Sequence, residues 1–310
     1  MTKTQTMKLA LYTEPLPPSF RWVPTNPWRG TEEFYVQTAT NLVALGHSVT
    51  VFYDGADTQL DGVDYVSRSR YRGGFDVVLC CNTPPPALLP GTKHVYWTNL
   101  YKDTIERHLW ADAFVAISAF ASDQFGVIDS DAGRRQAAVV PHGLAPEDLQ
   151  ILPGPKEPIA LYSSSMDRGG HMLKALWDSF GVKDLQGTPI RLVCTEGKLS
   201  NAEVRDLYRR SLLWLHPGLG VELFCISALK AKAAGCLCLY SPVMALGETI
   251  GQQSGHVALG SLFWKRRAAG LVREALESGK YKSEEAQISG VGLPSWLTVT
   301  TKLESVLKSV

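Results

Sequence analysis

Short hydrophobic runs alternate with amphipathic stretches along the whole chain. In the first half, several of these runs are almost continuously apolar, which is typical of parallel strands covered on both faces. Between the first two runs, an apolar stripe with helical spacing follows the acidic Glu32 and Glu33 and stops at Gly46, which predicts a helix. The strands predicted in this half are Lys8–Tyr12, Ser48–Phe52, Asp76–Cys81, His94–Trp97, Ala113–Ala116 and Ala138–Val140. Strand, helix and strand in this order form the unit of a doubly wound parallel sheet.

The same alternation starts again after a proline-rich stretch. Four prolines lie between Pro146 and Pro158, which is typical of a linker between domains. Beyond it, Ser200 and Glu203 have the spacing of a capping box, and a further helix is predicted from about 224 to 234. The strands predicted here are Ile159–Tyr162, Ile190–Cys194, Leu212–Leu215 and Cys236–Tyr240. We therefore predict an α/β protein with two tandem Rossmann-like domains, 1–145 and 146–293, facing a cleft.

Composition agrees with two soluble domains and excludes several classes of protein. A length of 310 residues with 45% hydrophobic and 20% charged residues suits two globular domains and rules out general disorder. Lys and Arg number 31 against 30 Asp and Glu, so binding to nucleic acid through bulk charge is excluded. No apolar run has the length of a membrane helix, and the polar N-terminus does not have the pattern of a signal peptide. The six cysteines form no CxxC motif. We expect a metal-free, cytoplasmic protein.

Three loops carry residues that could bind an anionic ligand, each between a predicted strand and a helix. The first, 27–33, contains Gly30, where the backbone can come close to a ligand. The second, 162–170, combines three hydroxyls, Arg168 and two glycines, which suits a phosphate group. The third, 215–225, places Glu222 behind two glycines at the start of a helix. Locally, each loop is also compatible with a plain turn, a solvated arginine or a helix cap.

The order of these loops resembles retaining glycosyltransferases of the GT-B architecture, the large group with an E-x7-E signature. The segment 42–51 is similar to that family's first helix and second strand, and Pro141-His142-Gly143 to its turn before the linker. The segment 207–217 resembles another family motif, and 222–250 resembles the donor-sugar helix and the loop after it. Residues 294–310 resemble the C-terminal helix that crosses back to the N-terminal domain. The likeness covers nearly the whole chain.

The resemblance implies roles for individual residues. The C-terminal domain would bind the donor, with Glu222 gripping the sugar and Arg168 standing where the family often has a phosphate-binding lysine. Further donor contacts are implied for Gly30, Ser163, Ser164, Gly169, Lys230 and the backbone of Leu223, Phe224 and Cys225. Asn99 lies where many members place a histidine near the donor sugar, so it joins Glu222 and Arg168 as a catalytic candidate. The N-terminal domain would bind the acceptor through Glu14, Trp28, Tyr101 and Lys102.

The sequence departs from the family pattern at three positions. Lys230 occupies the place of the second signature acid, and Ser163 that of a common phosphate-binding arginine. The first loop has Arg29-Gly30 where two glycines are common. A catalytically degenerate protein that only binds nucleotide sugars therefore stays open, as does an epimerase or hydrolase on the same scaffold.

The function implied is transfer of a hexose or pentose from a nucleotide-diphosphate sugar to an acceptor hydroxyl. The resemblance implies retention of the anomeric configuration. No paired-aspartate motif of metal-dependent transferases is present, so we expect no metal requirement and no cofactor beyond the co-substrate. UDP-sugars and GDP-sugars are the expected donors. The acceptor stays open among a glycan, a lipid, a small molecule, a protein and a modified nucleic acid, and the oligomeric state stays open too.

Overall fold

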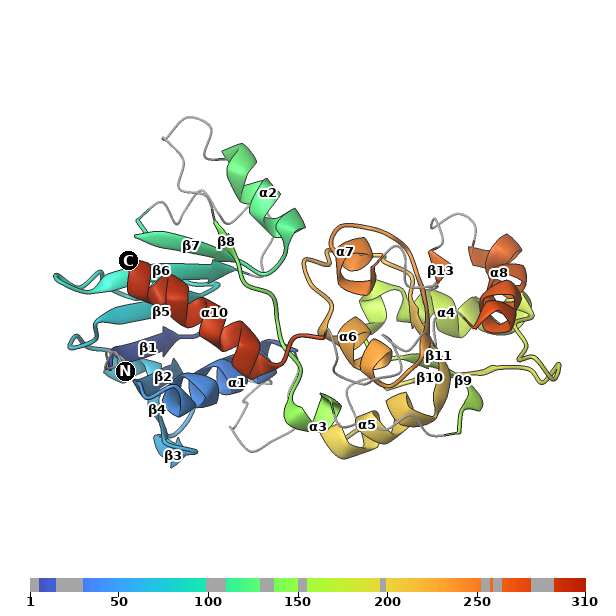
Figure 1. The fold of residues 1–310 in the computed structure, drawn as a ribbon, viewed down its shortest axis with the longest axis horizontal. Helices are drawn as coiled ribbons and strands as arrows, with labels where there is room; N and C mark the ends of the chain where they lie inside the picture. Colours follow the sequence, from blue (N-terminus) through green and yellow to red (C-terminus); the bar gives the residue numbers. More distant parts are fainter. Residues whose placement is uncertain are drawn as a thin grey trace. The chain divides into compact units, whose positions relative to one another are not determined.

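The computed structural model describes residues 6–14, 30–98, 110–128, 137–149, 155–195, 199–251, 257–258, 264–279 and 293–310. The chain divides into two compact units. Unit 1 contains residues 1–143 together with 296–310, and unit 2 contains residues 144–295. The C-terminal helix α10 (Trp296–Ser309) is therefore part of unit 1, where it packs along α1 (Gly30–Ala44) (Figure 1).

Unit 1 is built on an eight-stranded sheet with the order β3-β4-β2-β1-β5-β6-β7-β8. All neighbouring strands are parallel except β3 and β4, which form an antiparallel edge. The strands are β1 (Lys8–Tyr12), β2 (Ser48–Tyr53), β3 (Thr58–Leu60), β4 (Val63–Ser67), β5 (Val77–Cys81), β6 (Lys93–Thr98), β7 (Ala113–Ala116) and β8 (Ala138–Val139). A second helix of this unit, α2 (Ala119–Ile128), connects β7 to β8.

The two faces of this sheet are covered differently. Because side chains alternate along a strand, Leu9 and Leu11 of β1 point to one face and Ala10 and Tyr12 to the other. The second set belongs to an apolar cluster that also contains Phe52 of β2. Beside β2 and β4 this cluster is covered by the connection between β4 and β5, which includes the short 3₁₀ turn Arg68–Arg70 and no α-helix.

Unit 2 is built on a five-stranded, fully parallel sheet with the order β10-β9-β11-β12-β13. Its strands are β9 (Glu157–Tyr162), β10 (Arg191–Cys194), β11 (Ser211–His216), β12 (Leu237–Tyr240) and β13 (Val257–Ala258). Its helices are α3 (Pro146–Leu149), α4 (Gly170–Leu176), α5 (Asn201–Arg210), α6 (Ile226–Ala233), α7 (Leu246–Ile250) and α8 (Trp264–Ser278), with 3₁₀ turns at Met166–Arg168 and Trp177–Phe180.

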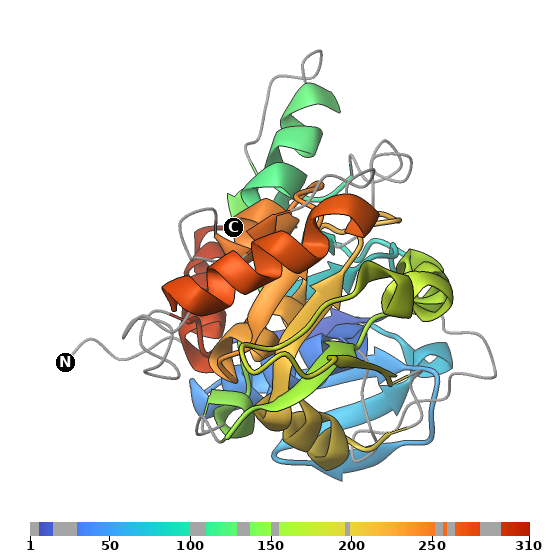
Figure 2. The same ribbon diagram turned by 90° about the vertical axis from the view of Figure 1, so that its right-hand side faces the viewer.

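Helices cover both faces of the unit 2 sheet. Residues of α4, the 3₁₀ turn Trp177–Phe180 and α8 form one apolar cluster with β9, β11 and β12, and α8 lies across these strands in Figure 2. Residues of α5, α6 and α7 form a second cluster on the opposite face. The unit is therefore a doubly wound Rossmann-like domain, as the alternation of strands and helices predicts.

The connections reverse direction next to the first strand of each unit. In unit 2, β9 has β10 on one side and β11 on the other, so the loops after β9 and β11 diverge. In unit 1, β1 is flanked in the same way by β2 and β5. The crevice beside such a reversal, at the carboxyl ends of the strands, is where open α/β sheets bind their ligands. In unit 2 these two loops contain Arg168 and Glu222.

The division between the units falls between Gly143 and Leu144, two residues before the boundary expected at 145. Leu144 is fully buried against Leu229 and Ala233 of α6. Its backbone N–H donates to the carbonyl of Pro294 at 2.8 Å, so both chain segments at this point are fixed to unit 2. None of the helices in the described residues has both the length and the apolar character needed to cross a bilayer.

Candidate functional site

Arg168 and Glu222 meet at the carboxyl end of the unit 2 sheet. Arg168 ends the 3₁₀ turn after β9, and Glu222 lies in the loop between β11 and α6. The Arg168 guanidinium donates from Nη1 to Oε2 of Glu222 at 2.8 Å. The Glu222 side chain is 7% exposed, whereas that of Arg168 is 40% exposed. A guanidinium has five N–H groups, so most of the Arg168 donors remain available to a ligand phosphate.

His216 is a third member of this group. It is the last residue of β11, and its side chain is 1% exposed. Its Nε2 lies 3.3 Å from Oε2 of Glu222, and its Nδ1 accepts a hydrogen bond from the backbone N–H of Gly218 at 3.2 Å. His216 was not among the residues predicted from the sequence. The signal was a histidine at the end of a buried strand, directly before Pro217-Gly218.

Glycines let the two loops pack tightly around this group. Gly169 has φ 115°, and a Cβ placed there would lie 2.8 Å from Cβ of Pro217. Gly218 has φ 70°, and a Cβ there would lie 2.6 Å from Cγ2 of Val243. A Cβ on Gly220 would lie 3.3 Å from Cγ of Arg168. Side chains at the first two positions would be strained and would push apart the loops that hold Arg168 and His216.

The loop then leads into α6. Leu223 and Cys225 are buried, and Cys225 caps the helix without a side-chain hydrogen bond to it. The first backbone N–H groups of a helix have no partner within it, so the start of α6 is suited to bind an anionic group. Burial, followed by the Glu222 charge, raises the pKa of the Cys225 thiol well above its ordinary value, which keeps it neutral and unreactive. Phe224 packs against the cluster around Leu229.

Ser163 is held inside unit 2. Its hydroxyl lies 2.6 Å from the Tyr208 hydroxyl and accepts a hydrogen bond from Nε1 of Trp214 at 3.0 Å. This network links the loop after β9 to α5 and β11. Ser164 is half-buried in the same loop. Ser163 therefore fixes the shape of the loop, whatever further contacts it makes with a ligand.

Lys230 is turned toward an internal acid. Its Nζ lies 3.2 Å from Oδ2 of Asp148, which is fully buried in α3. The other carboxylate oxygen of Asp148 accepts a hydrogen bond from Nε of Arg205 at 2.9 Å. A buried carboxylate needs such partners. Lys230 therefore forms an ion pair with an acid from α3.

The described candidates of unit 1 lie where β1 ends and α1 begins. Gly30 is the first residue of α1, and the buried Glu32 follows it. Burial raises the pKa of the Glu14 carboxyl, the nearby Glu32 charge raises it further, and a hydrogen bond with Asn82 opposes the shift. Asn82 follows β5 with φ 60°, so it adjoins the crevice beside β1. The other candidates of this unit, Trp28, Asn99, Tyr101 and Lys102, lie outside the described residues.

One group of side chains in the described residues has the donor types of a metal site. Ligand atoms of His216, Glu222 and Cys225 lie within 4.8 Å of one another. The Arg168 guanidinium contacts the same Glu222 carboxylate, so it already supplies positive charge at this position. A cation bound here would compete with Arg168 for Glu222.

Comparison with known proteins shows similarity in structure. No protein-family model matches the sequence, and no curated protein sequence matches it. A sucrose-phosphate synthase from Thermosynechococcus elongatus superposes with a TM-score of 0.69 at 12% identity, over 97% of this chain and 98% of that chain. AviGT4, a glycosyltransferase involved in avilamycin A biosynthesis, superposes with a TM-score of 0.66 at 16% identity, over 97% of each chain.

A third structure contains bound ligands. The catalytic domain of starch synthase IV from Arabidopsis thaliana, bound to ADP and acarbose, superposes with a TM-score of 0.61 at 10% identity, over 98% of this chain and 99% of that chain. Similarity at such low identity establishes the fold. The chain therefore has the GT-B glycosyltransferase fold, with two Rossmann-like domains.

Proposed function

We propose that this protein is a glycosyltransferase that moves a sugar from a nucleotide-diphosphate sugar to an acceptor hydroxyl. The observation that carries the proposal is the contact of Arg168 with the buried Glu222 at the strand reversal of unit 2. Arg168 can bind a diphosphate, and Glu222 can bind sugar hydroxyls. The two side chains lie side by side at the carboxyl ends of the strands, where open α/β sheets bind their ligands. The ADP in the starch synthase structure supports a nucleotide as the ligand.

In the proposed complex, different side chains bind different parts of the donor. Arg168 binds the diphosphate with its free N–H groups, while the start of α6 offers further backbone donors. Glu222 accepts hydrogen bonds from sugar hydroxyls, and His216 lies beside its carboxylate, with Nε2 3.3 Å from Oε2. Lys230 would donate to the nucleotide ribose or to a phosphate only by leaving its ion pair with Asp148. We retain UDP-sugars and GDP-sugars of a hexose or pentose as the donors to test first.

The reaction proposed retains the anomeric configuration. The bond from the sugar C1 to the diphosphate oxygen breaks, and a bond from C1 to the acceptor oxygen forms on the same face of the sugar. The acceptor proton passes to the departing phosphate oxygen, so no strong protein base is needed. Arg168 stabilises the charge that develops on the leaving diphosphate, and such fixed charges are the largest contribution in many enzymes. Because Arg168 supplies this charge, we propose that no divalent metal is required.

The proposed acceptor site lies on unit 1, beside the end of β1. Glu14 and Asn82 adjoin the crevice there and offer an acceptor and a donor of hydrogen bonds to a hydroxylated molecule. Among the predicted acceptor residues, Glu14 is the one within the described part of the chain.

Turnover with Glu222→Gln tests the proposed role of the carboxylate. A panel of nucleotide sugars and simple acceptors is screened first, and the anomeric configuration of the product is read by NMR. The substitution removes the charge that pairs with Arg168 and weakens the grip on the sugar, so we expect a loss of about a hundredfold or more in kcat/KM. Chelation of divalent metals is expected to leave the wild-type rate unchanged. Full activity of the variant would contradict the assignment.

A second function is favoured by one observation. Lys230 is paired with Asp148 where the family signature has an acid, so a catalytically inactive protein that binds nucleotide sugars is the alternative. Binding of a nucleotide sugar by calorimetry, without transfer or hydrolysis of any donor, would support this alternative over the transferase.

A further inference from the structure

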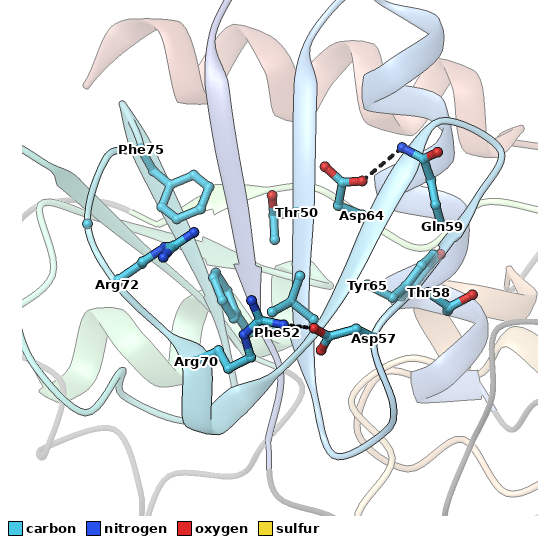
Figure 3. A pocket seen from close by; sticks show the side chains of 12 residues that line it. Thr50, Phe52, Asp57, Thr58, Gln59, Asp64, Tyr65, Arg70, Arg72 and Phe75 are labelled. Carbon is cyan, nitrogen blue, oxygen red and sulfur yellow. Dashed lines mark hydrogen bonds and ion pairs between the residues drawn. The ribbon is translucent and has the colours of Figure 1, made fainter.

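Unit 1 contains a cavity of about 570 Å³ over strands β2 and β4. Thr50 and Phe52 of β2 lie at its floor (Figure 3), and Val66 of β4 also lines it. This volume lies within the usual range for small-molecule sites, about 300 to 1,000 Å³. The cavity belongs to unit 1, whereas Arg168 and Glu222 belong to unit 2.

The topology explains why the sheet is open here. The chain runs from β2 through the β3–β4 edge and then reaches β5 through residues 68–76, which form a short 3₁₀ turn and a loop. In a doubly wound sheet such a connection is ordinarily a helix that covers the face. No α-helix of the described residues covers this part of the sheet. The rings of Tyr71 and Phe75 pack on Phe52, which is 2% exposed, and the hollow beside them is bordered by loops.

One wall of the cavity carries a cation that has no partner within the described part of the chain. Arg70 forms an ion pair with Asp57, whose other carboxylate oxygen accepts a hydrogen bond from the backbone N–H of Ser67 at 2.9 Å. Arg72 is exposed, and it makes no hydrogen bond or ion pair with any of the described residues. Figure 3 shows Arg72 beside Phe75 on this wall. A free guanidinium next to an aromatic ring suits an anionic group attached to a ring.

The opposite wall offers acceptors of hydrogen bonds. Nε2 of Gln59 donates to Oδ1 of Asp64 at 2.9 Å, and both side chains are exposed. The second carboxylate oxygen of Asp64 and the amide oxygen of Gln59 can each accept from a ligand hydroxyl. The Thr50 hydroxyl lies between the two walls (Figure 3). The cavity is therefore cationic at one end and rich in hydroxyl-binding groups at the other.

We propose that this cavity is a second ligand site, separate from the proposed donor site, for a sugar that carries a phosphate or a carboxylate. Its anionic group binds Arg72, its ring lies against Phe75, and its hydroxyls bind Asp64, Gln59 and Thr50. Glucose 6-phosphate and glucuronate share this chemistry. The site does not depend on the function proposed for Arg168 and Glu222, because no residue is common to the two.

Titration calorimetry on the full chain tests the site with four probes: glucose 6-phosphate, glucuronate, glucose and inorganic phosphate. We expect saturable binding of at least one of the two charged sugars, tighter than binding of glucose or phosphate alone. Arg72→Gln should weaken binding of the charged sugar about tenfold, because the anionic group loses its guanidinium. Phe75→Leu should weaken it as well. The matched control is Arg191→Gln, an exposed arginine of unit 2, which should have no effect.

Each result decides for or against the site. Absence of binding of both charged sugars at millimolar concentration would overturn the proposal, as would equal affinity of wild type and Arg72→Gln. Binding of inorganic phosphate as tight as that of the sugars, unaffected by Phe75→Leu, would show an anion site without recognition of a ring and would also overturn it. Circular dichroism of each variant confirms that it is folded. A preference between phosphate and carboxylate identifies the ligand class.

Discussion

Single residues set the geometry of the proposed donor site through backbone conformation and burial. Gly169 turns the chain directly after Arg168, and its φ of 115° lies in the region that side chains rarely adopt. His216 is buried between Glu222 and the backbone N–H of Gly218. These residues hold Arg168 and Glu222 at hydrogen-bonding distance before any ligand arrives, which is the arrangement that gives fixed charges their effect.

Gly169→Ala should therefore impair the donor site. The new Cβ meets Pro217 at 2.8 Å and requires a strained φ, so the loop of Arg168 must shift. We expect a loss of about 1 to 3 kcal/mol in the free energy of unfolding and weaker nucleotide binding. Gly187→Ala is the matched control, because Gly187 also has a positive φ of 85° but no atom within 4 Å of the added Cβ. Equal nucleotide affinity in both variants would contradict the role of the loop.

His142 makes stability depend on pH. It is stacked on Phe34 with ring centroids 5.1 Å apart, and burial lowers its pKa from 6.5 to about 3. The unfolded chain therefore takes up the proton first as the pH falls, so the contribution of His142 is present above pH 6.5 and is lost progressively toward pH 3. Its full loss is on the order of 4 to 5 kcal/mol.

His142→Phe removes this titration and keeps an aromatic ring against Phe34. Denaturant unfolding measured between pH 7 and the lowest pH at which both proteins fold should show a smaller decrease for the variant than for wild type. If the free energies of unfolding of the two proteins change in parallel with pH, the pKa of His142 is the same in the folded and the unfolded chain, which would contradict the prediction.

At the scale of elements, the sequence predicts those parts whose pattern is set by burial on both faces. The strands β1 and β7 begin and end as predicted, and the capping box of Ser200 and Glu203 is confirmed at the start of α5. The edge strand β3 and its neighbour β4 were missed. β3 has only three residues, which are mostly exposed and show no apolar pattern, and β4 was not recognised although its first residues alternate between buried and exposed. The cavity over β2 and β4 depends on these strands, so it could not be foreseen either.

Two residues of the candidate site were singled out from the sequence, whereas two of the contacts around them were not. Arg168 and Glu222 stood out because hydroxyls, glycines and charges coincide between strand and helix, and the structure brings their side chains together. The pairing of Lys230 with Asp148 was not predictable, because α3 approaches α6 across 82 positions of sequence, and only tertiary structure brings them together. The contact of His216 with Glu222 was missed for a different reason: the two residues are close in sequence, but only the path of the loop between β11 and α6 brings their side chains within 3.3 Å.

The Lys156 side chain forms hydrogen bonds with the ends of two helices, so a substitution there tests how much this contact between elements stabilises unit 2. Its Nζ donates to the carbonyls of Arg209 at the end of α5 and Ala234 after α6, at 3.0 and 2.6 Å. Burial lowers the pKa of this amine, and the carbonyls satisfy it. Lys156→Met leaves these buried acceptors without a partner, so we expect a loss of about 2 kcal/mol in the free energy of unfolding. The exposed Lys183→Met should change it little, and equal stability of both variants would contradict the assignment.

At the scale of the whole molecule, the two units have the same architecture and different chemistry. Each is a sheet of mainly parallel strands with a reversal of connections beside its first strand. Unit 2 presents Arg168 and Glu222 at that position, whereas unit 1 presents Glu14 and Asn82 there and has an additional cavity over β2 and β4. From this difference we propose a division into a donor-binding unit 2 and an acceptor-binding unit 1, and donor binding in unit 2 is its central claim.

Calorimetric titration of nucleotide diphosphates and their sugars into wild type, Arg168→Ala and Arg191→Ala tests that claim most directly. We predict that one UDP- or GDP-linked ligand binds wild type and Arg191→Ala with a single site and equal affinity. Arg168→Ala should bind it at least tenfold more weakly, which corresponds to about 1.4 kcal/mol or more. Undiminished affinity of Arg168→Ala for that ligand, or failure of every nucleotide tested to bind the wild-type protein, would contradict the account.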